Sequence, residues 1–150
     1  MRETRRHAVR VAVVDDSTFI RMAISRMLED DPDVDLVGCA GSGEELLEHL
    51  EEWRPDVLTL DLDMPGMGGL ETLERVMMGQ YKTPVIILST HSGVGAPQTI
   101  EALHRGATDF IDKQRFSLVD FGALRKVLLE KIFEVTGRTR APAEEAFDDE

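Results

Sequence analysis

Residues 58–69 read LTLDLDMPGMGG, and this stretch combines an apolar segment, two acids and a turn. Val57–Leu60 has the short, largely apolar character of a strand that is buried on both faces of a sheet. Asp61 and Asp63 follow at once, and Pro65 with three glycines then marks a tight turn. A pair of acids one residue apart also fits a helix cap or a solvated loop. The other strand ends must therefore decide how these acids are used.

The composition is typical of one soluble globular domain. The chain has 150 residues, of which 42% are hydrophobic and 31% are charged. Cys39 is the sole cysteine, which excludes an internal disulfide and suits a reducing compartment, so we expect a cytoplasmic protein. The longest apolar runs are too short to span a bilayer. Residues 1–10 contain arginines but no apolar segment behind them, so they do not resemble a secretory signal.

The net charge of −12 is unevenly distributed. Residues 1–10 carry a charge of +3 and residues 141–150 carry −5, so the intervening body is strongly acidic. Such a surface repels phosphate backbones and anionic lipids, which argues against binding to nucleic acid or membranes. It favours partners with basic surfaces, or metal ions.

Strand-like and helix-like segments alternate five times along the chain. The predicted strands are short β-branched or apolar runs, each followed by apolar residues at helical spacing: Val9–Val14, Val34–Ala40, Val57–Leu60, Pro84–Ser89 and Thr108–Asp112. The last predicted helix, Leu118–Thr136, ends before Gly137. This alternation predicts an α/β fold with a doubly wound, five-stranded parallel sheet and helices on both faces. We expect a flexible N-terminus over residues 1–8, one domain over 9–137, and an acidic tail or linker over 138–150.

Acidic, hydroxyl and ammonium groups follow four of the predicted strands. In a doubly wound sheet, ligands bind at the carboxyl ends of the strands. The groups expected there are Asp15, Asp16, Asp61, Ser89, Thr90 and Lys113. Each of them alone fits a helix cap or a solvated loop, but their arrival from four strands at one edge indicates a site.

The expected cluster of carboxylates has a clear chemical use. Crowded carboxylates repel one another, and a hard divalent cation such as Mg²⁺ relieves that repulsion. The four histidines are scattered and form no cluster with Cys39, so zinc is not indicated. A carboxylate beside Mg²⁺, a lysine and a hydroxyl suits phosphoryl transfer, because a carboxylate oxygen can attack phosphorus to give an acyl phosphate.

Four motifs in this order resemble the receiver domain of bacterial two-component response regulators: VVDDS (residues 13–17), LDLDMPGMGGLE (60–71), PVIILST (84–90) and GATDFIDK (106–113). The resemblance extends from about Val9 to Gly137. Within the family, VVDDSTFIRMAISRMLEDDPDVDLVG and GLETLERVM are most similar to the receiver at the front of chemotaxis methylesterases. The resemblance implies a flavodoxin-like fold with strand order 2-1-3-4-5.

The resemblance also implies roles for the acids at the strand ends. Asp61 would be the phosphoacceptor. Asp15, Asp16 and the Asp61 carboxylate would bind Mg²⁺, together with the backbone carbonyl of Asp63.

Further residues of the family pattern would bind the phosphoryl group or respond to it. Ser89 and Lys113 would contact the phosphoryl oxygens, and Phe110 would change its rotamer as Ser89 moves. Asp63 and His91 would tune the rate of dephosphorylation. The surface formed by the helix around Ile100, the fifth strand and the last helix would carry the output.

The implied partners are proteins. The phosphoryl donor would be the phosphohistidine of a sensor histidine kinase or phosphotransfer protein. The output would reach a downstream protein or a fused effector domain. The domain would then be a switch that catalyses its own phosphotransfer and dephosphorylation, without being an enzyme in the usual sense.

Two other classes of protein share part of this pattern. Haloacid-dehalogenase phosphatases also place two acids one residue apart after a strand, but on the first strand and with a cap domain. A receiver-like interaction module that takes no phosphate would keep the fold and lose the chemistry. Labelling by acetyl phosphate distinguishes these classes: a receiver forms a stable adduct, a phosphatase turns over, and an interaction module does neither.

Gln114 departs from the family pattern, in which proline usually follows the lysine and the bond between them is cis. A cis bond before a residue other than proline costs about 2.5–4 kcal/mol. We therefore predict a trans Lys113–Gln114 bond, a displaced path through Arg115 and Phe116, and a Lys113 side chain that still reaches the acids.

Overall fold

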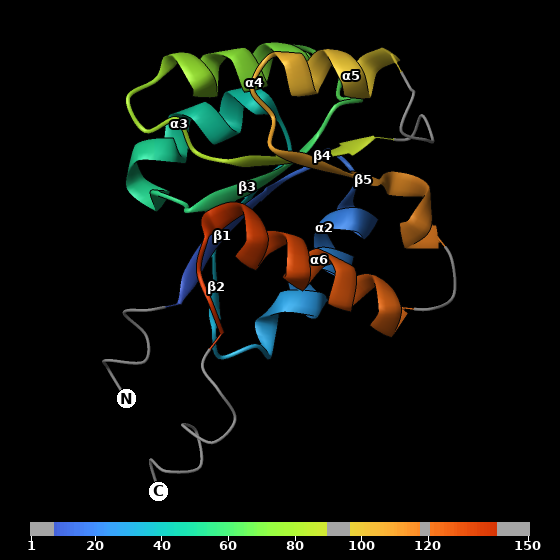
Figure 1. The fold of residues 1–150 in the computed structure, drawn as a ribbon. Coiled ribbons are helices and arrows are strands. Elements are labelled where there is room, and N and C mark those ends of the chain that lie inside the picture. Colours follow the sequence, from blue (N-terminus) through green and yellow to red (C-terminus); the bar gives the residue numbers. More distant parts are fainter. Residues whose placement is uncertain (1–7, 90–96, 118–120, 141–150) are drawn as a thin grey trace, which may run out of the picture.

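The computed structural model describes residues 8–89, 97–117 and 121–140. It forms one five-stranded parallel sheet in the order β2-β1-β3-β4-β5, which confirms the predicted class and strand order (Figure 1). The strands are β1 (Val9–Val14), β2 (Val34–Ala40), β3 (Val57–Asp61), β4 (Val85–Ser89) and β5 (Asp109–Asp112). The helices are α2 (Thr18–Glu29), α3 (Gly43–Trp53), α4 (Gly68–Met78), α5 (Pro97–His104) and α6 (Phe121–Thr136), with a 3₁₀ helix η1 (Lys113–Ser117) after β5.

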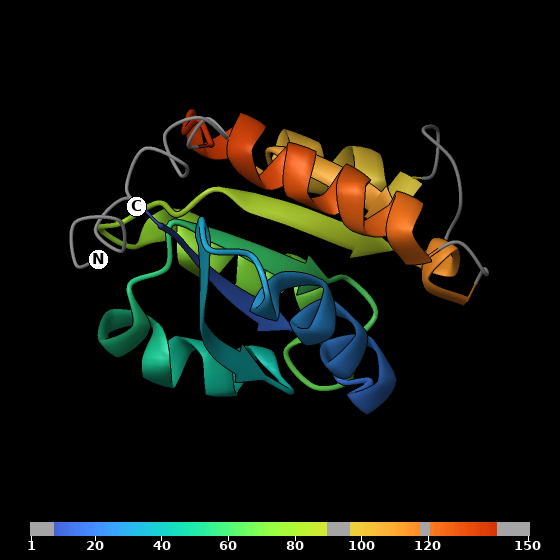
Figure 2. The same ribbon diagram turned by 90° about the horizontal axis from the view of Figure 1, so that it is seen from below.

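The helices cover the sheet in two layers. Helices α2 and α6 lie on one face, nearest the viewer in Figure 2, and α3, α4 and α5 lie on the other. Alternate residues of β1 divide between the layers, because successive side chains of a strand point to opposite faces. Val11 and Val13 belong to the core under α2 and α6, whereas Ala12 and Val14 belong to the core under α3 and α4. From Val11 to Val14, β1 is therefore apolar on both faces.

The segment before the last helix contains one element that was not predicted. Helix α6 is described from Phe121, and its predicted start at Leu118 lies outside the described part of the chain. The turn from Lys113 to Ser117 is a short 3₁₀ helix, which the sequence pattern did not predict. Phe116 anchors it in the core beneath α6 and is only 3% exposed.

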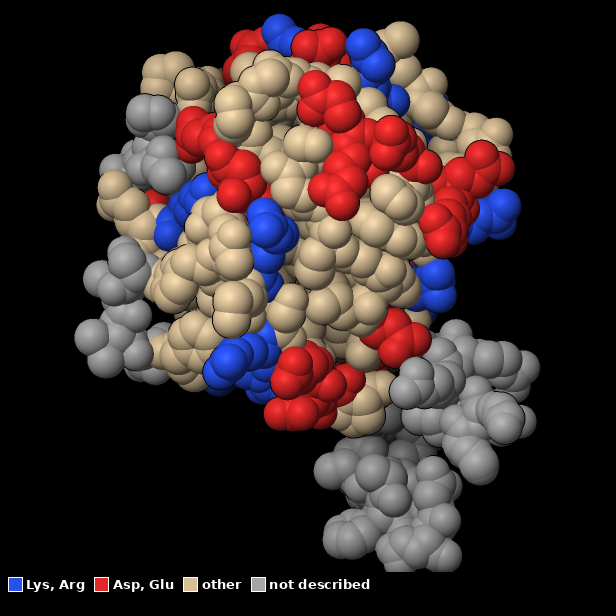
Figure 3. Space-filling model, turned by 180° about the vertical axis from the view of Figure 1, so that it is seen from behind, with Lys and Arg blue, Asp and Glu red and all other residues tan. Residues whose placement is uncertain are grey.

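Helix α3 packs closely on β2 through its last residue. The Trp53 ring covers Gly38 so tightly that a Cβ at residue 38 would lie 2.3 Å from the ring. The His49 ring stacks on the Trp53 ring, with centroids 4.8 Å apart. Five glutamates on the outer side of α3 are exposed: Glu44, Glu45, Glu48, Glu51 and Glu52. Figure 3 shows acidic side chains gathering on one part of the surface, in keeping with the acidic body of the chain.

Two arginines after α6 bind back to the body of the domain. Arg140 Nη2 lies 2.7 Å from Asp31 Oδ2, and its guanidinium covers the ring of Phe133. Arg138 Nη2 lies 3.2 Å from Asp56 Oδ2. Asp31 is nearly buried and also faces Arg125 of α6. The chain that leaves α6 is therefore held beside the α2–β2 loop and the start of β3.

Candidate functional site

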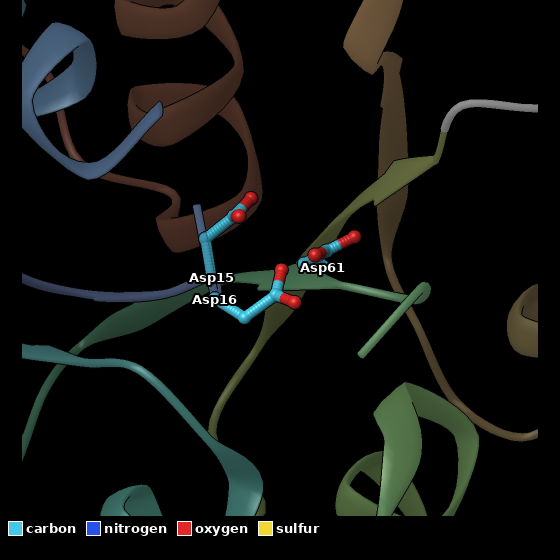
Figure 4. Close-up of side chains that lie close together, drawn as sticks. All are labelled: Asp15, Asp16 and Asp61. Atoms are coloured by element: carbon cyan, nitrogen blue, oxygen red, sulfur yellow. The ribbon is translucent and has the colours of Figure 1, made fainter. Parts of the chain in front are cut away.

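The acids meet where β1 and β3 end. These strands are parallel neighbours, with Val14 paired to Leu60, so the residues that follow them lie side by side. One carboxylate oxygen each of Asp15, Asp16 and Asp61 lies within 4.8 Å of the others (Figure 4). Asp15 and Asp61 are fully buried, and Asp16 is exposed. The sequence-based prediction of an acid cluster at this edge thus has a direct geometric counterpart.

Lys113 reaches the cluster from the end of β5. Its Nζ lies 2.8 Å from Asp61 Oδ2 and 3.2 Å from Asp15 Oδ1, and its side chain is 11% exposed. No peptide bond between described residues is cis, so the Lys113–Gln114 bond is trans. Two of the three predictions about this departure from the family pattern, the trans bond and the lysine that still reaches the acids, are confirmed. The displaced path through Arg115 and Phe116 stays a prediction.

Backbone groups fix the two buried carboxylates. The amide N–H of Asp63 donates to Asp61 Oδ1 at 2.9 Å, and the amide N–H of Ser17 donates to Asp15 Oδ1 at 2.8 Å. Asp15 Oδ2 is buried and has no hydrogen-bond partner in the described part of the chain. A buried carboxylate oxygen without a donor is costly in a folded protein unless a further ligand satisfies it.

Burial controls the electrostatics of the site. Burial raises the pKa of Asp61 from 3.8 to about 6. The negative charge of Asp15 raises this pKa further, whereas the hydrogen bonds from Lys113 and from the Asp63 amide lower it. Burial likewise raises the pKa of Asp15. Burial alone would lower the pKa of Lys113. The hydrogen bonds to Asp61 and Asp15, together with the attraction of their negative charges, outweigh burial and raise this pKa. The Lys113 ammonium contacts two of the three clustered carboxylates, so their negative charge exceeds the positive charge that Lys113 supplies.

These residues fit a hard divalent cation. Three converging carboxylates supply the oxygen ligands that Mg²⁺ prefers, and Asp15 Oδ2 is an oxygen without a donor. A single ammonium cannot neutralise the cluster. The electrostatic requirement and the ligand type thus agree.

The structure also describes three of the other residues predicted for the site. Ser89 is buried at the end of β4, directly after Leu88, which pairs with Asp61. Asp63 is half-buried in the loop after β3. Phe110 is half-buried on β5 and packs against the core under α4 and α5. His91 lies outside the described residues.

Three local contacts complete the site, and those of Arg21 and Asp112 were not predicted from sequence. Arg21 Nη1 donates to the backbone oxygen of Asp15 at 2.6 Å and so holds the turn that carries two acids. Ser17, rather than Asp16, caps α2 by accepting from the Ile20 amide. Asp112 Oδ1 accepts from the Gln114 amide at 3.0 Å in the turn that carries Lys113. Only the serine before a helical pattern offered a recognisable signal.

None of the helices in the described parts of the chain has both the length and the apolar character needed to cross a membrane.

Comparison with known proteins gives consistent matches. The family model for the response regulator receiver domain matches residues 11–120. A protein-glutamate methylesterase/protein-glutamine glutaminase of Nitratidesulfovibrio vulgaris is 44% identical over 131 residues, which is 87% of this chain and 35% of that protein. The enzyme of the same name from Bacillus licheniformis is 42% identical over 88% of this chain and 37% of its own length. The chain thus spans about a third of the length of these relatives.

Solved structures agree with these matches. The response regulator domain of Thermotoga maritima CheB has a TM-score of 0.79 and 40% identity, covering 89% of this chain and 99% of that one. The Vibrio cholerae chemotaxis protein CheY4 has a TM-score of 0.68 and 31% identity, covering 85% of this chain and 98% of that one.

Proposed function

The chain belongs to the family of response regulator receiver domains, and we propose that it accepts a phosphoryl group on Asp61 in a reaction that depends on Mg²⁺. It is a receiver of the kind found in chemotaxis methylesterases, and receivers are phosphoacceptor switches. The observation that supports Asp61 is its carboxylate, which is buried between Lys113 and two further acids. No match favours a haloacid-dehalogenase phosphatase or a module that takes no phosphate.

The chemistry that we propose is an in-line transfer. An Asp61 oxygen forms a bond to phosphorus while the bond from phosphorus to the donor's imidazole nitrogen breaks, and the imidazole keeps the electron pair. Lys113 already contacts Asp61 Oδ2, so its ammonium would lie beside the transferred oxygens. The backbone hydrogen bond from Asp63 holds the other Asp61 oxygen in place during the attack.

We propose that Asp15, Asp16 and Asp61 bind Mg²⁺, with the backbone carbonyl of Asp63 as a further ligand. When bound, Mg²⁺ would supply positive charge to the phosphoryl oxygens. The raised pKa of Asp61 supports this role, because a nearby cation favours the ionised carboxylate that the attack requires.

The switch that we propose runs from Ser89 to the surface of α5, β5 and α6. Ser89 pairs with Asp112 of β5, and the residue before it, Leu88, pairs with Asp61 of β3. A phosphoryl group on Asp61 would attract the Ser89 hydroxyl, and Phe110 would follow into the space beside β4. Phe110 is half-buried, which leaves it room to alter its exposure.

We propose that Asp63 and His91 tune how long the phosphoryl group persists. Asp63 is half-buried next to the acceptor and can position an attacking water molecule. Replacing either residue with alanine should change the decay rate of the adduct and leave Mg²⁺ affinity unchanged. Equal decay in both variants and the wild type would contradict this role.

The partners belong to the same proposal. The donor would be a sensor histidine kinase or a phosphotransfer protein in the cytoplasm. The output would reach a downstream protein or a fused effector domain, and the methylesterase relatives favour the second.

Labelling with acetyl phosphate tests the proposed function. We expect one Mg²⁺-dependent phosphoryl adduct per chain, found on Asp61 by peptide mass spectrometry, and none in Asp61→Asn. Continuous turnover without an adduct would indicate a phosphatase. A chain that neither gains an adduct nor turns over would indicate an interaction module.

A further inference from the structure

Asp112 closes the turn that carries Lys113. Its Oδ1 accepts a hydrogen bond from the Gln114 amide at 3.0 Å, and Lys113 is the residue between them. The Asp112 backbone is fixed on the sheet side, because Asp112 pairs with Ser89 of β4. On the other side of Lys113, Phe116 is buried in the core beneath α6. The lysine therefore leaves the backbone within a turn that is anchored at both ends.

We propose that Asp112 is a positioning residue for Lys113 and acts through the Gln114 amide. The inference rests on the proposed function, in which the Lys113 ammonium contacts the phosphoryl group on Asp61. Lys113 spans from β5 across β4 to acids on β3 and β1, so a small rotation of its backbone displaces the ammonium at the far end of a long side chain.

Gln114 makes this arrangement possible. A proline at this position would have no N–H to donate to Asp112. It would also disfavour the helical backbone of the residue before it, which here is Lys113 at the start of η1. The hydrogen bond that the Gln114 amide donates to Asp112 thus gives the turn a local restraint, which requires a residue other than proline at 114.

Two explanations of an Asp112 effect make different predictions. If Asp112 acts as a hydrogen-bond acceptor, asparagine can replace it, because its side-chain oxygen accepts the same N–H. If Asp112 acts through its negative charge on Lys113, asparagine fails as alanine does. Only the first explanation requires the Gln114 amide.

The experiment measures the rate of labelling of the 150-residue chain by acetyl phosphate at saturating Mg²⁺. Asp112→Ala should slow labelling by about 2- to 10-fold, the range that one net hydrogen bond supports. Asp112→Asn should restore the wild-type rate. Mg²⁺ affinity, measured by calorimetry, should be the same in all three proteins, because the metal would be bound by acids on other strands. Asp30→Ala, which removes an exposed carboxylate at the end of α2, is the matched control and should have no effect.

A double-mutant cycle with Gln114→Pro tests the link to the amide. In that background Asp112→Ala should change the labelling rate no further, since the N–H is already absent. Hydrogen exchange of the Gln114 amide is a measurement that depends neither on activity nor on the proline variant. The exchange rate of this amide should increase in Asp112→Ala and stay unchanged in Asp112→Asn.

The positioning role would be overturned if acetyl phosphate labelled Asp112→Asn as slowly as Asp112→Ala. It would also be overturned if Asp112→Ala slowed labelling equally in the wild-type and Gln114→Pro backgrounds. Failure of the proposed function looks different, because the wild-type chain would then give no adduct at all. That result would overturn both proposals.

Discussion

Replacing Asp61 with asparagine should stabilise the metal-free protein at neutral and alkaline pH. The Asp61 carboxyl is fully buried, and its pKa rises from 3.8 to about 6. Asparagine has nearly the same volume, keeps an oxygen for the Asp63 amide and removes the buried charge. Lys113 retains its contact with Asp15 Oδ1.

The size and sign of the effect follow from the proton that the native state holds. Between pH 3.8 and about 6 the native Asp61 keeps a proton that the unfolded chain has released. The free energy of unfolding of the wild type therefore falls as the pH rises through this window. Each pKa unit corresponds to about 1.4 kcal/mol. The ionised Asp61 therefore lowers the free energy of unfolding by about 3 kcal/mol above this pH window, and by about 1 kcal/mol near pH 4.5.

Urea unfolding followed by circular dichroism measures this difference. In the presence of a chelator, Asp61→Asn should exceed the wild type by about 3 kcal/mol at pH 8 and by about 1 kcal/mol at pH 4.5. Saturating Mg²⁺ should narrow the gap at pH 8, because the ion stabilises only the protein that binds it. Asp30→Asn, at an exposed site, should stay within about 0.5 kcal/mol of the wild type.

An Asp61→Asn variant that is no more stable than the wild type at pH 8 would refute the reasoning. It would mean that Lys113 fully compensates the buried charges. A gap that does not shrink at acidic pH would show that the stabilisation does not come from the ionisation of Asp61.

Three further predictions concern the metal, the turn after β3 and the end of the described chain. Asp16→Ala should weaken Mg²⁺ binding in calorimetry more than Asp15→Ala does, because Asp15 Oδ1 is already shared with Lys113 and the Ser17 amide; the reverse order would contradict the assigned ligands. Gly69→Ala should lower the free energy of unfolding by about 1–3 kcal/mol, because its Cβ would lie 2.4 Å from the backbone of Leu62; an unchanged urea midpoint would argue against this close approach. Asp31→Ala should accelerate tryptic cleavage after Arg140, measured by mass spectrometry against Asp30→Ala; equal rates would show that the ion pair does not hold this segment.

Sequence reasoning was reliable where one physical cause dominates. Val11–Val14 and Val85–Leu88 are buried on both faces, so these continuously apolar runs predicted central parallel strands. The carboxyl ends of such strands share one edge, so the acids after β1 and β3 could be expected to meet. The strand order came from the resemblance to receivers, since the alternation of strands and helices does not specify it.

Sequence reasoning failed for structural features that depend on one specific polar contact, because such a contact leaves no periodic pattern in the sequence. The pairing of Arg140 with Asp31 joins residues that are far apart in the chain and leaves no periodic pattern. Arg21 looks like any polar residue of an amphipathic helix until its bond to the Asp15 carbonyl is seen. The 3₁₀ helix from Lys113 to Ser117 includes a hydrogen bond from the Gln114 amide to the Asp112 side chain, and helix and strand propensities do not reveal such a local contact.

The position of Trp53 determines what fluorescence can report. It is the sole tryptophan, and it ends α3 just before β3 begins, at the edge of the sheet opposite the acid cluster. Its indole emission therefore depends on the packing of α3 over Gly38 and on the stacked His49 ring. Unfolding should produce a large red shift of that emission. Binding of Mg²⁺ or a phosphoryl group should leave the spectrum almost unchanged, so a quenching signal on adding the metal would mean that the conformational change crosses the whole sheet.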